Sequence, residues 1–464
     1  MSLKRLLIIP LISTKKYIWR ESDFITWINF VKSWPDVYVY MLVNKEAEES
    51  IPDEYRFPNL GYLPIVDWVP FAMAQTCVTG EMLELFNPLN GKYQVDCCMT
   101  SKTAAAASIK RMLWIGESVR IPVFISELKA ADYNSTHDDV FDLDLKLRSV
   151  SYSECPTFFG TEREKKIGIR AGERYLSPAM LDKIRGNGYV RSMGTPLKAL
   201  HKRAHELPKF DQFTLLFAAR FNSNKRWDAV LETFETYCRM NDDVRAIAVA
   251  PSLPVGGDTK LTHFQKTEIH EALPRQEYLD TLSRIHLSVS MSIEEGFAFG
   301  WSEQIATGNP VLFPDRAWAR SLMPKKEYEK CFYKDDKHLL ALIEYMRQNY
   351  DEIRKEIAPA VEWFVNEHDL PHAAQQYRDH MWEHTKHTFE AYKDWIPRLE
   401  EALDGMPNEF TMKEFMQLAH KLGCRFGQLI RQHSATSAFR NAWMWLREHA
   451  DPQMTQEMVF KKRV

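Results

Sequence analysis

The sequence lacks the features that mark membrane-spanning, secreted and zinc-binding proteins. No apolar run reaches the roughly 20 residues of a transmembrane helix. The seven cysteines are scattered and odd in number, and no C-x-x-C pair occurs, so neither a disulfide framework nor a structural zinc site is expected. The N-terminal stretch MSLKRLLIIPLIS has no small-residue cleavage site, which favours a first buried strand over a signal peptide. We therefore expect a cytoplasmic protein.

The composition is that of a soluble globular protein, with 45% hydrophobic and 27% charged residues. A chain of 464 residues is too long for one ordinary core, which predicts two domains and an appendage. The net charge of −3 indicates no partner by itself, and the oligomeric state is left open.

The first 200 residues alternate between short apolar runs and helical patterns. Strands are expected at residues 6–11, 37–43, 93–100, 119–126 and 155–161, and helices at 23–34 and 103–117. This alternation predicts a parallel sheet with helices on both faces. The polar stretch 129–148 is expected to form a loop or lid.

A second α/β unit begins near residue 211. Strands are expected at 211–220, 244–251, 286–292 and 310–315, and helices at 224–240 and 275–285. The Lys- and Arg-rich stretch 183–205 is expected to be a linker. After Asp336 the pattern is almost wholly helical, with breaks at Pro359, Pro371, Pro397 and Pro407. The expected domains are therefore 1–205, 206–375 and a helical region at 376–464.

The stretch SIEEGFAFGWSEQIATGNPV, residues 292–311, combines two carboxylates with three glycines. The early glycines disfavour one continuous helix. The pattern predicts a strand, a glycine-rich turn and a helix from about Trp301 to Thr307 that ends at Gly308. The free N–H groups at the start of such a helix suit a phosphate.

Two cations follow the first strand of this unit, Arg220 and Lys225. Ligands of open α/β sheets bind at the carboxyl ends of the strands, so the two cations suit a diphosphate. The alternative is that both merely solvate a loop.

Taken together, residues 218–234 and 273–315 resemble the nucleotide-sugar-binding domain of retaining GT-B glycosyltransferases. This family includes many bacterial mannosyl- and glucosyltransferases, and its members carry an Arg and a Lys followed by a Glu-x7-Glu motif. The matching residues are Arg220, Lys225, Glu295, Gly296, Phe297, Glu303, Ala306, Gly308, Pro310 and Val311. The resemblance implies two Rossmann-like domains facing across a cleft, with a helical C-terminal extension.

The resemblance also implies a role for each residue of the donor site. Arg220 and Lys225 would neutralise the diphosphate as the nucleotide leaves. Glu295, with the backbone of Gly296 and Phe297, would hold hydroxyls of the donor sugar. The segment from Ala298 through Phe299 to Ser302 would bring a helix N-terminus to the phosphate oxygens. Glu303 would accept hydrogen bonds from the ribose, and Leu273 to Arg275 would lie near the base. The donor would be a nucleoside diphosphate sugar, UDP-linked as a first guess, with no cofactor and no metal.

Two features depart from the family pattern. Ala298 stands where the family has a glycine, and the first strand of the chain lacks the usual glycine pair near the acceptor. Three other chemistries are alternatives for residues of this sequence. Asp142 and Asp144 match the Asp-x-Asp of metal-dependent transferases. The two glutamates could form a glycosidase pair, and His137 could orient an acceptor hydroxyl.

The acceptor is predicted from local charge. Six Lys or Arg residues lie in 183–203, and the tail from 405 carries an excess of cations. Thr411 and Glu414 form a capping box, and residues 414–433 resemble a helix-turn-helix, although a helical hairpin packed on the catalytic domain is an alternative. These features favour DNA with hydroxylated bases as the acceptor. The alternatives are a polysaccharide or glycolipid transferase, and a non-catalytic nucleotide-sugar-binding protein.

Overall fold

The computed structural model describes most of the chain. Its described residues are 5–10, 17–20, 22–65, 80–86, 93, 95–115, 119–127, 139–253, 261–390, 396–422, 445–446, 449–453 and 459–462. Within this part of the chain, no helix combines the length and the apolar character needed to cross a membrane.

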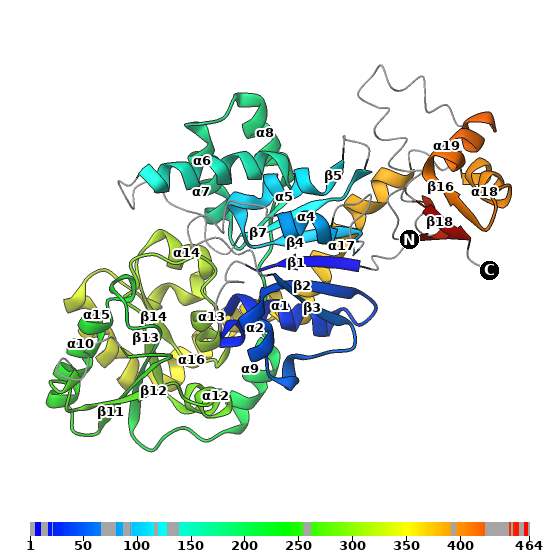
Figure 1. The fold of residues 1–464 in the computed structure, drawn as a ribbon. Coiled ribbons are helices and arrows are strands. Elements are labelled where there is room, and N and C mark those ends of the chain that lie inside the picture. Colours follow the sequence, from blue (N-terminus) through cyan, green and yellow to red (C-terminus); the bar gives the residue numbers. More distant parts are fainter. Residues whose placement is uncertain are drawn as a thin grey trace.

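The N-terminal domain is built on a seven-stranded parallel sheet (Figure 1), with strand order β3-β2-β1-β4-β7-β8-β9. The strands are β1 Arg5–Ile9, β2 Tyr38–Asn44, β3 Leu60–Ile65, β4 Cys97–Thr100, β7 Val123–Glu127, β8 Thr157–Phe159 and β9 Gly188–Val190. Its helices are α1 Ser22–Ser33, α2 Lys45–Ser50, α4 Gly80–Phe86, α5 Ala106–Met112, α6 Asp139–Glu154, α7 Glu162–Glu173 and α8 Pro178–Asn187. A two-stranded ribbon, β5 Trp114–Ile115 and β6 Val119–Arg120, lies beside α5.

Successive residues of β1 enter two different cores. Leu6 and Ile8 pack with α1, whereas Leu7 and Ile9 pack with α5. This follows from the period of two along a strand. The sheet therefore has helices on both faces, as the apolar runs predicted.

The second domain is a six-stranded parallel sheet in the order β12-β11-β10-β13-β14-β15. Its strands are β10 Phe213–Ala218, β11 Val244–Ala250, β12 Thr267–Glu271, β13 Leu287–Val289, β14 Val311–Pro314 and β15 Phe332–Tyr333. Its helices are α9 Leu197–Glu206, α10 Trp227–Met240, α12 Arg275–Arg284, α13 Phe299–Ala306, α14 Ala317–Leu322, α15 Asp336–Gln348 and α16 Tyr350–His368. The central strands are buried along their length and form one core with these helices.

Helix α17, Leu370–Glu390, returns to the N-terminal domain. Its residues Ala374 and Tyr377 are buried with α1 and β8, and the indole N–H of Trp34 donates to the carbonyl of Ala374 at 3.0 Å. The expected domain boundary at residue 375 falls inside this helix.

The C-terminal region contains helices α18 Ile396–Asp404 and α19 Met412–Lys421. It also holds a three-stranded antiparallel sheet, in which β18 Val459–Lys462 lies between β16 Glu409–Thr411 and β17 Ala450–Gln453. The expected capping box at Thr411 and Glu414 is present at the start of α19. The remainder of the helix-turn-helix prediction, from residue 423, lies outside the described residues.

Three expectations about local structure were wrong. The supposed loop at 129–148 is helical from Asp139, in α6. The supposed linker at 183–205 contains the end of α8, strand β9 and most of α9, whose apolar residues pack on the second domain. Pro359 lies inside α16 rather than breaking it. In α6 and α9, polar residues surround an apolar face that packs in a domain core. In α16, buried apolar residues continue on both sides of Pro359.

Candidate active site

The turn after β10 brings Lys225 to the carboxyl edge of the second sheet. Asn222 caps a short 3-10 turn at Ser223–Lys225, its side chain accepting a hydrogen bond from the backbone N–H of Lys225 at 3.1 Å. Arg226 then adopts a left-handed conformation, with φ 48°, before α10 begins. The Lys225 side chain is thereby fixed against the loop that follows β13.

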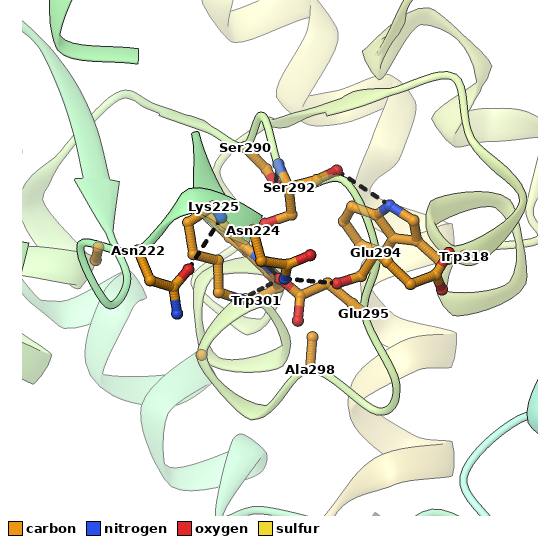
Figure 2. Close-up of polar contacts among 12 residues, drawn as sticks. Asn222, Asn224, Lys225, Ser290, Ser292, Glu294, Glu295, Ala298, Trp301 and Trp318 are labelled. Atoms are coloured by element: carbon orange, nitrogen blue, oxygen red, sulfur yellow. Dashed lines mark hydrogen bonds and ion pairs between the residues drawn. The ribbon is translucent and has the colours of Figure 1, made fainter. Parts of the chain in front are cut away.

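The loop between β13 and α13 is held on both sides by hydrogen bonds (Figure 2). The backbone N–H of Ile293 donates to the carbonyl of Asn224 at 2.8 Å, and the side-chain amide of Asn224 donates to the carbonyl of Glu294 at 2.8 Å. The indole N–H of Trp318 donates to the carbonyl of Ser292 at 3.2 Å. The loops carrying Lys225 and Glu295 therefore form one connected unit.

Lys225 and Glu295 form an ion pair at the centre of this unit. Both side chains are largely buried, at 15% and 12% exposed. Trp301 borders the pair, its indole nitrogen 3.5 Å from a carboxylate oxygen of Glu295 and its ring 5.9 Å from the Lys225 ammonium. Charge-assisted contacts in such a partly dry site are stronger and better oriented than on the surface.

Helix α13 begins beside this ion pair. It starts at Phe299, two residues before the predicted start, and no side chain caps it at Ala298. The first N–H groups of a helix have no partner within the helix, so they are available to an anion. Phe297 and Ala298 are buried and fix the approach of the chain to the helix. Gly308, with φ 75°, ends the segment in the left-handed conformation expected of it.

The second glutamate of the motif lies along α13 and is paired with Arg275. Glu303 accepts hydrogen bonds from both terminal nitrogens of the Arg275 guanidinium, one of them at 3.2 Å. Arg275 is the first residue of α12 and follows Leu273, a half-buried residue packed on the core. Glu303 also hydrogen-bonds Tyr278, whose pKa is raised by burial and by this carboxylate. The structure thus brings together Glu303 and Arg275, two of the residues predicted to hold ribose and base.

Arg220 lies on the same sheet edge but outside these ion pairs. It follows β10, its side chain is exposed, and it makes no side-chain hydrogen bond or ion pair with another described residue. The structure therefore places Arg220 at the rim of the site, with its guanidinium facing solvent.

The competing Asp-x-Asp motif falls in α6 of the N-terminal domain. The carboxylate of Asp144 accepts a hydrogen bond from Arg148 at 2.6 Å, one turn further along the helix. The side chain of Asp142 and the whole of His137 lie outside the described residues. Across the described residues, no group of three or more His, Cys, Asp or Glu side chains has the arrangement of a metal site.

Sequence reasoning missed several residues that shape the site. Asn224 was overlooked because a lone amide in a loop carries no signal. Trp301 was read only as the start of a helix. On the N-terminal side, the carboxylate of Glu127, at the end of β7, accepts hydrogen bonds from Thr103 at 2.8 Å and from Tyr152. This buried cluster sits at the carboxyl edge of the N-terminal sheet, where an acceptor would be expected.

Comparison with known proteins rests on structure, because no protein-family model and no curated protein matches the sequence significantly. Sucrose-phosphate synthase from Thermosynechococcus elongatus superposes with a TM-score of 0.58 at 14% identity, covering 84% of this chain and 100% of that one. Both parallel sheets are included in a match of that extent. The chain has the GT-B fold.

Two further solved structures share this GT-B fold. Trehalose-6-phosphate synthase from E. coli, bound to UDP-2-fluoro glucose, matches with a TM-score of 0.57 at 10% identity, covering 82% of this chain and 99% of that one. A glycosyltransferase from Rickettsia africae matches with a TM-score of 0.55 at 12% identity, covering 82% and 98%. The expectation of two parallel-sheet domains with a helical C-terminal region is confirmed, with the small antiparallel sheet as an addition.

Proposed function

We propose that the chain is a glycosyltransferase that moves a sugar from a nucleoside diphosphate sugar to a hydroxyl acceptor. The observation that carries the proposal is the set of groups around α13. Glu295, paired with Lys225, precedes the uncapped N-terminus of α13, and Glu303, paired with Arg275, lies about one turn into the helix. This order matches the sugar, diphosphate and nucleoside of one extended donor.

Each group has a chemical task in this proposal. Glu295 holds sugar hydroxyls, and the backbone of Gly296 and Phe297 contributes further contacts. Lys225, assisted by Arg220 and the α13 N-terminus, stabilises the negative charge that builds on the departing diphosphate. Glu303 accepts hydrogen bonds from the ribose hydroxyls. The base lies near Leu273 and Arg275.

Transfer with retention and without a metal fits this set of groups. Two cations and a helix N-terminus supply the positive charge that a metal would otherwise provide. The departing phosphate oxygen takes the proton of the acceptor hydroxyl as the new glycosidic bond forms on the same face. We propose UDP as the nucleotide, since the fold neighbour from E. coli was solved with UDP-2-fluoro glucose. Turnover should therefore survive excess chelator.

The proposal is tested by nucleotide release from a panel of nucleoside diphosphate sugars. Glu295→Ala should abolish turnover while the fold is retained, because it removes sugar contacts and little packing. Glu367→Ala, an exposed carboxylate on α16, is the matched control. If no donor binds to the wild-type protein, the proposed function is overturned. Binding without release would favour the non-catalytic binding protein.

A hydroxylated base in DNA remains our second, more specific proposal for the acceptor. The observation in its favour is the charge of residues 405–464, which hold nine Lys or Arg against five Asp or Glu. In the described part of this region, α18 and α19 contact each other and share a core with β16 and β18. The cationic stretch 183–203 gives less support, since Arg185 and Arg203 are paired with Asp182 and Asp280.

The acceptor is identified by incubating the enzyme and labelled donor with ordinary DNA, hydroxymethylated DNA, and glycan or lipid extracts. Label in hydroxymethylated DNA alone, with binding that weakens steeply with salt, supports DNA. The target base would have to leave the stack to reach the site. If label appears only in glycan or lipid, DNA is excluded as the acceptor and the polysaccharide or glycolipid alternative is favoured.

A further inference from the structure

The N-terminal domain contacts the donor loop directly, through the turn between β8 and α7. A Cβ placed on Gly160 of this turn would lie 2.7 Å from the Cβ of Phe297. Real side chains do not approach so closely, so only glycine fits here without a shift of the loop. Phe297 is one of the residues whose backbone faces the donor sugar in the proposed function. The two domains therefore meet at the donor loop itself.

An ion pair reinforces this contact one turn further along. Arg163, in the first turn of α7, reaches Glu294 of the donor loop, with Nη1 2.6 Å from one carboxylate oxygen and Nη2 donating to the other at 2.9 Å. The two side chains are only 18% and 28% exposed. The Nη2 hydrogen bond orients the pair, and the Nη1 contact adds charge attraction without hydrogen-bond geometry. Thr161 caps α7 by accepting from the N–H of Glu164, which holds the turn in place.

Glu294 makes one contact with each domain, through its carboxylate and through its backbone carbonyl. Its carboxylate is bound by Arg163 of the N-terminal domain, and its carbonyl by Asn224 of the loop that carries Lys225. Glu295, the next residue in the chain, pairs with Lys225. The position of the Glu295 backbone is therefore set jointly by both domains.

We infer that Arg163 and Gly160 are positioning residues, through which the N-terminal domain completes the donor-sugar subsite of the second domain. The inference rests on the proposed function. The nucleoside groups, Glu303 and Arg275, belong to the second domain and pair with each other, not with Arg163 or Glu294. From the N-terminal domain, Tyr55 interacts with Arg275. Binding of the free nucleotide therefore does not depend on the Arg163–Glu294 contact, whereas correct placement of the sugar requires it. Premature cleavage of the donor is thereby limited to molecules whose domains are docked.

The experiment compares binding of UDP, binding of UDP-glucose and turnover in Arg163→Gln, Glu294→Gln and the double variant. Each single variant should leave UDP affinity unchanged and should lower UDP-glucose affinity or turnover on the order of ten- to a hundredfold, the effect of a small misplacement. The double variant should lose no more than either single one. Arg163→Lys, which keeps a positive charge beside Glu294 and the buried Glu164, should lose less than Arg163→Gln. Arg185→Gln, which breaks an exposed pair with Asp182 in the same domain, is the matched control.

Gly160→Ala supplies an independent arm, because it leaves the ion pair intact and adds only the methyl group that meets Phe297. It should lower turnover and spare UDP binding in the same way. Thermal unfolding of every variant separates misfolding from misplacement. Additive losses in the double variant, a loss in Arg163→Lys equal to that in Arg163→Gln, or unchanged UDP-glucose turnover in Gly160→Ala overturns the inference. Failure of wild-type protein to bind UDP or UDP-glucose would instead overturn the proposed function.

Discussion

At the residue scale, the contacts of Lys225 orient its positive charge before a donor binds. Its ammonium sits between the Glu295 carboxylate and the face of Trp301, and its backbone N–H is fixed by Asn222. A donor diphosphate arriving at this point meets a charge that is already oriented and needs little reorganisation. Arg220, on the exposed rim, must order its side chain when the donor binds.

The cations are tested by Arg220→Ala and Lys225→Ala. Each should reduce turnover on the order of a hundredfold, the effect of removing one preorganised group that stabilises developing charge. Steady-state nucleotide release is the measurement, and Lys355→Ala, an exposed lysine on α16, is the control. Variants with wild-type rates would show that neither cation acts on the leaving group.

A buried histidine predicts how stability changes with pH. Burial, with help from Lys209 and Arg354, lowers the pKa of His286 from 6.5 to about 4, while Asp351 partly opposes this. The folded protein therefore keeps this ring neutral at a pH where the unfolded chain protonates it. The stability it contributes is complete above about pH 6.5 and is lost as the pH falls toward 4.

His286→Asn removes this titration and keeps an acceptor for the N–H of Thr214, which donates to Nδ1 of His286 at 3.1 Å. The variant should lose less stability than the wild type between pH 6.5 and pH 4, measured by urea unfolding at several pH values. Parallel curves for the two proteins would contradict the assignment.

At the scale of elements, the end of α13 depends on one backbone conformation. Gly308 has φ 75°, and a Cβ there would meet only ring carbons of His205 and His201, at 3.8 and 3.9 Å. Space is thus available, and the cost of a side chain is conformational. His201 also hydrogen-bonds the carbonyl of Ala306 at 2.7 Å, so α9 supports the same helix end.

Gly308→Ala should destabilise the protein by about 1–2 kcal/mol, the cost of a left-handed non-glycine residue. Gly186→Ala, within α8, has nothing within 4 Å of the new methyl group and should instead be stabilising by about 0.5–1 kcal/mol. Chemical unfolding should show a lower free energy of unfolding for Gly308→Ala and a higher one for Gly186→Ala than for the wild type. Equal destabilisation of the two variants would show that the left-handed φ of Gly308 is not the cause of its cost.

At the scale of the whole molecule, α17 joins the end of the chain to its beginning. Tyr377 is fully buried against Phe158, with ring centroids 4.2 Å apart, and lies 5.0 Å from Phe30. Where the chain crosses between the domains in both directions, the N–H of Thr195 donates to the carbonyl of His368, and the N–H of Leu370 donates to the carbonyl of Thr195. The N-terminal core is therefore incomplete until residues beyond 370 have been added.

Tyr377→Ala should cost about 3–5 kcal/mol, as expected for deletion of a large buried aromatic side chain. The loss should fall on the N-terminal domain, so thermal unfolding should separate into two steps, with nucleotide binding surviving the first. Tyr345→Ala, on an exposed part of α15, is the control and should change stability little. A single cooperative transition in both variants would contradict separate domain cores.

The sequence by itself determined the elements that are locally encoded. The apolar runs placed β1, β2, β10, β11 and β14, because strands buried on both faces consist of apolar residues. The glycine pattern placed the turn before α13 and its end at Gly308. The edge strands β3 and β12 were missed, since they are partly exposed and carry Pro64 or charged residues that edges tolerate. Helices α6 and α9 were missed because charged residues alternate with their apolar ones, which obscures the helical period.

Only the tertiary structure decided which of the candidate groups meet. Lys225 and Glu295 are 70 positions apart, and Arg275 and Glu303 are 28 apart, so neither pairing can be read from spacing. The packing of α17 on the N-terminal domain and the contact of Arg163 with Glu294 also join residues that are far apart in the sequence, so no local pattern predicts them. Period and turn chemistry act over a few residues, whereas ion pairs and shared cores form between segments that only the packed sheets bring together.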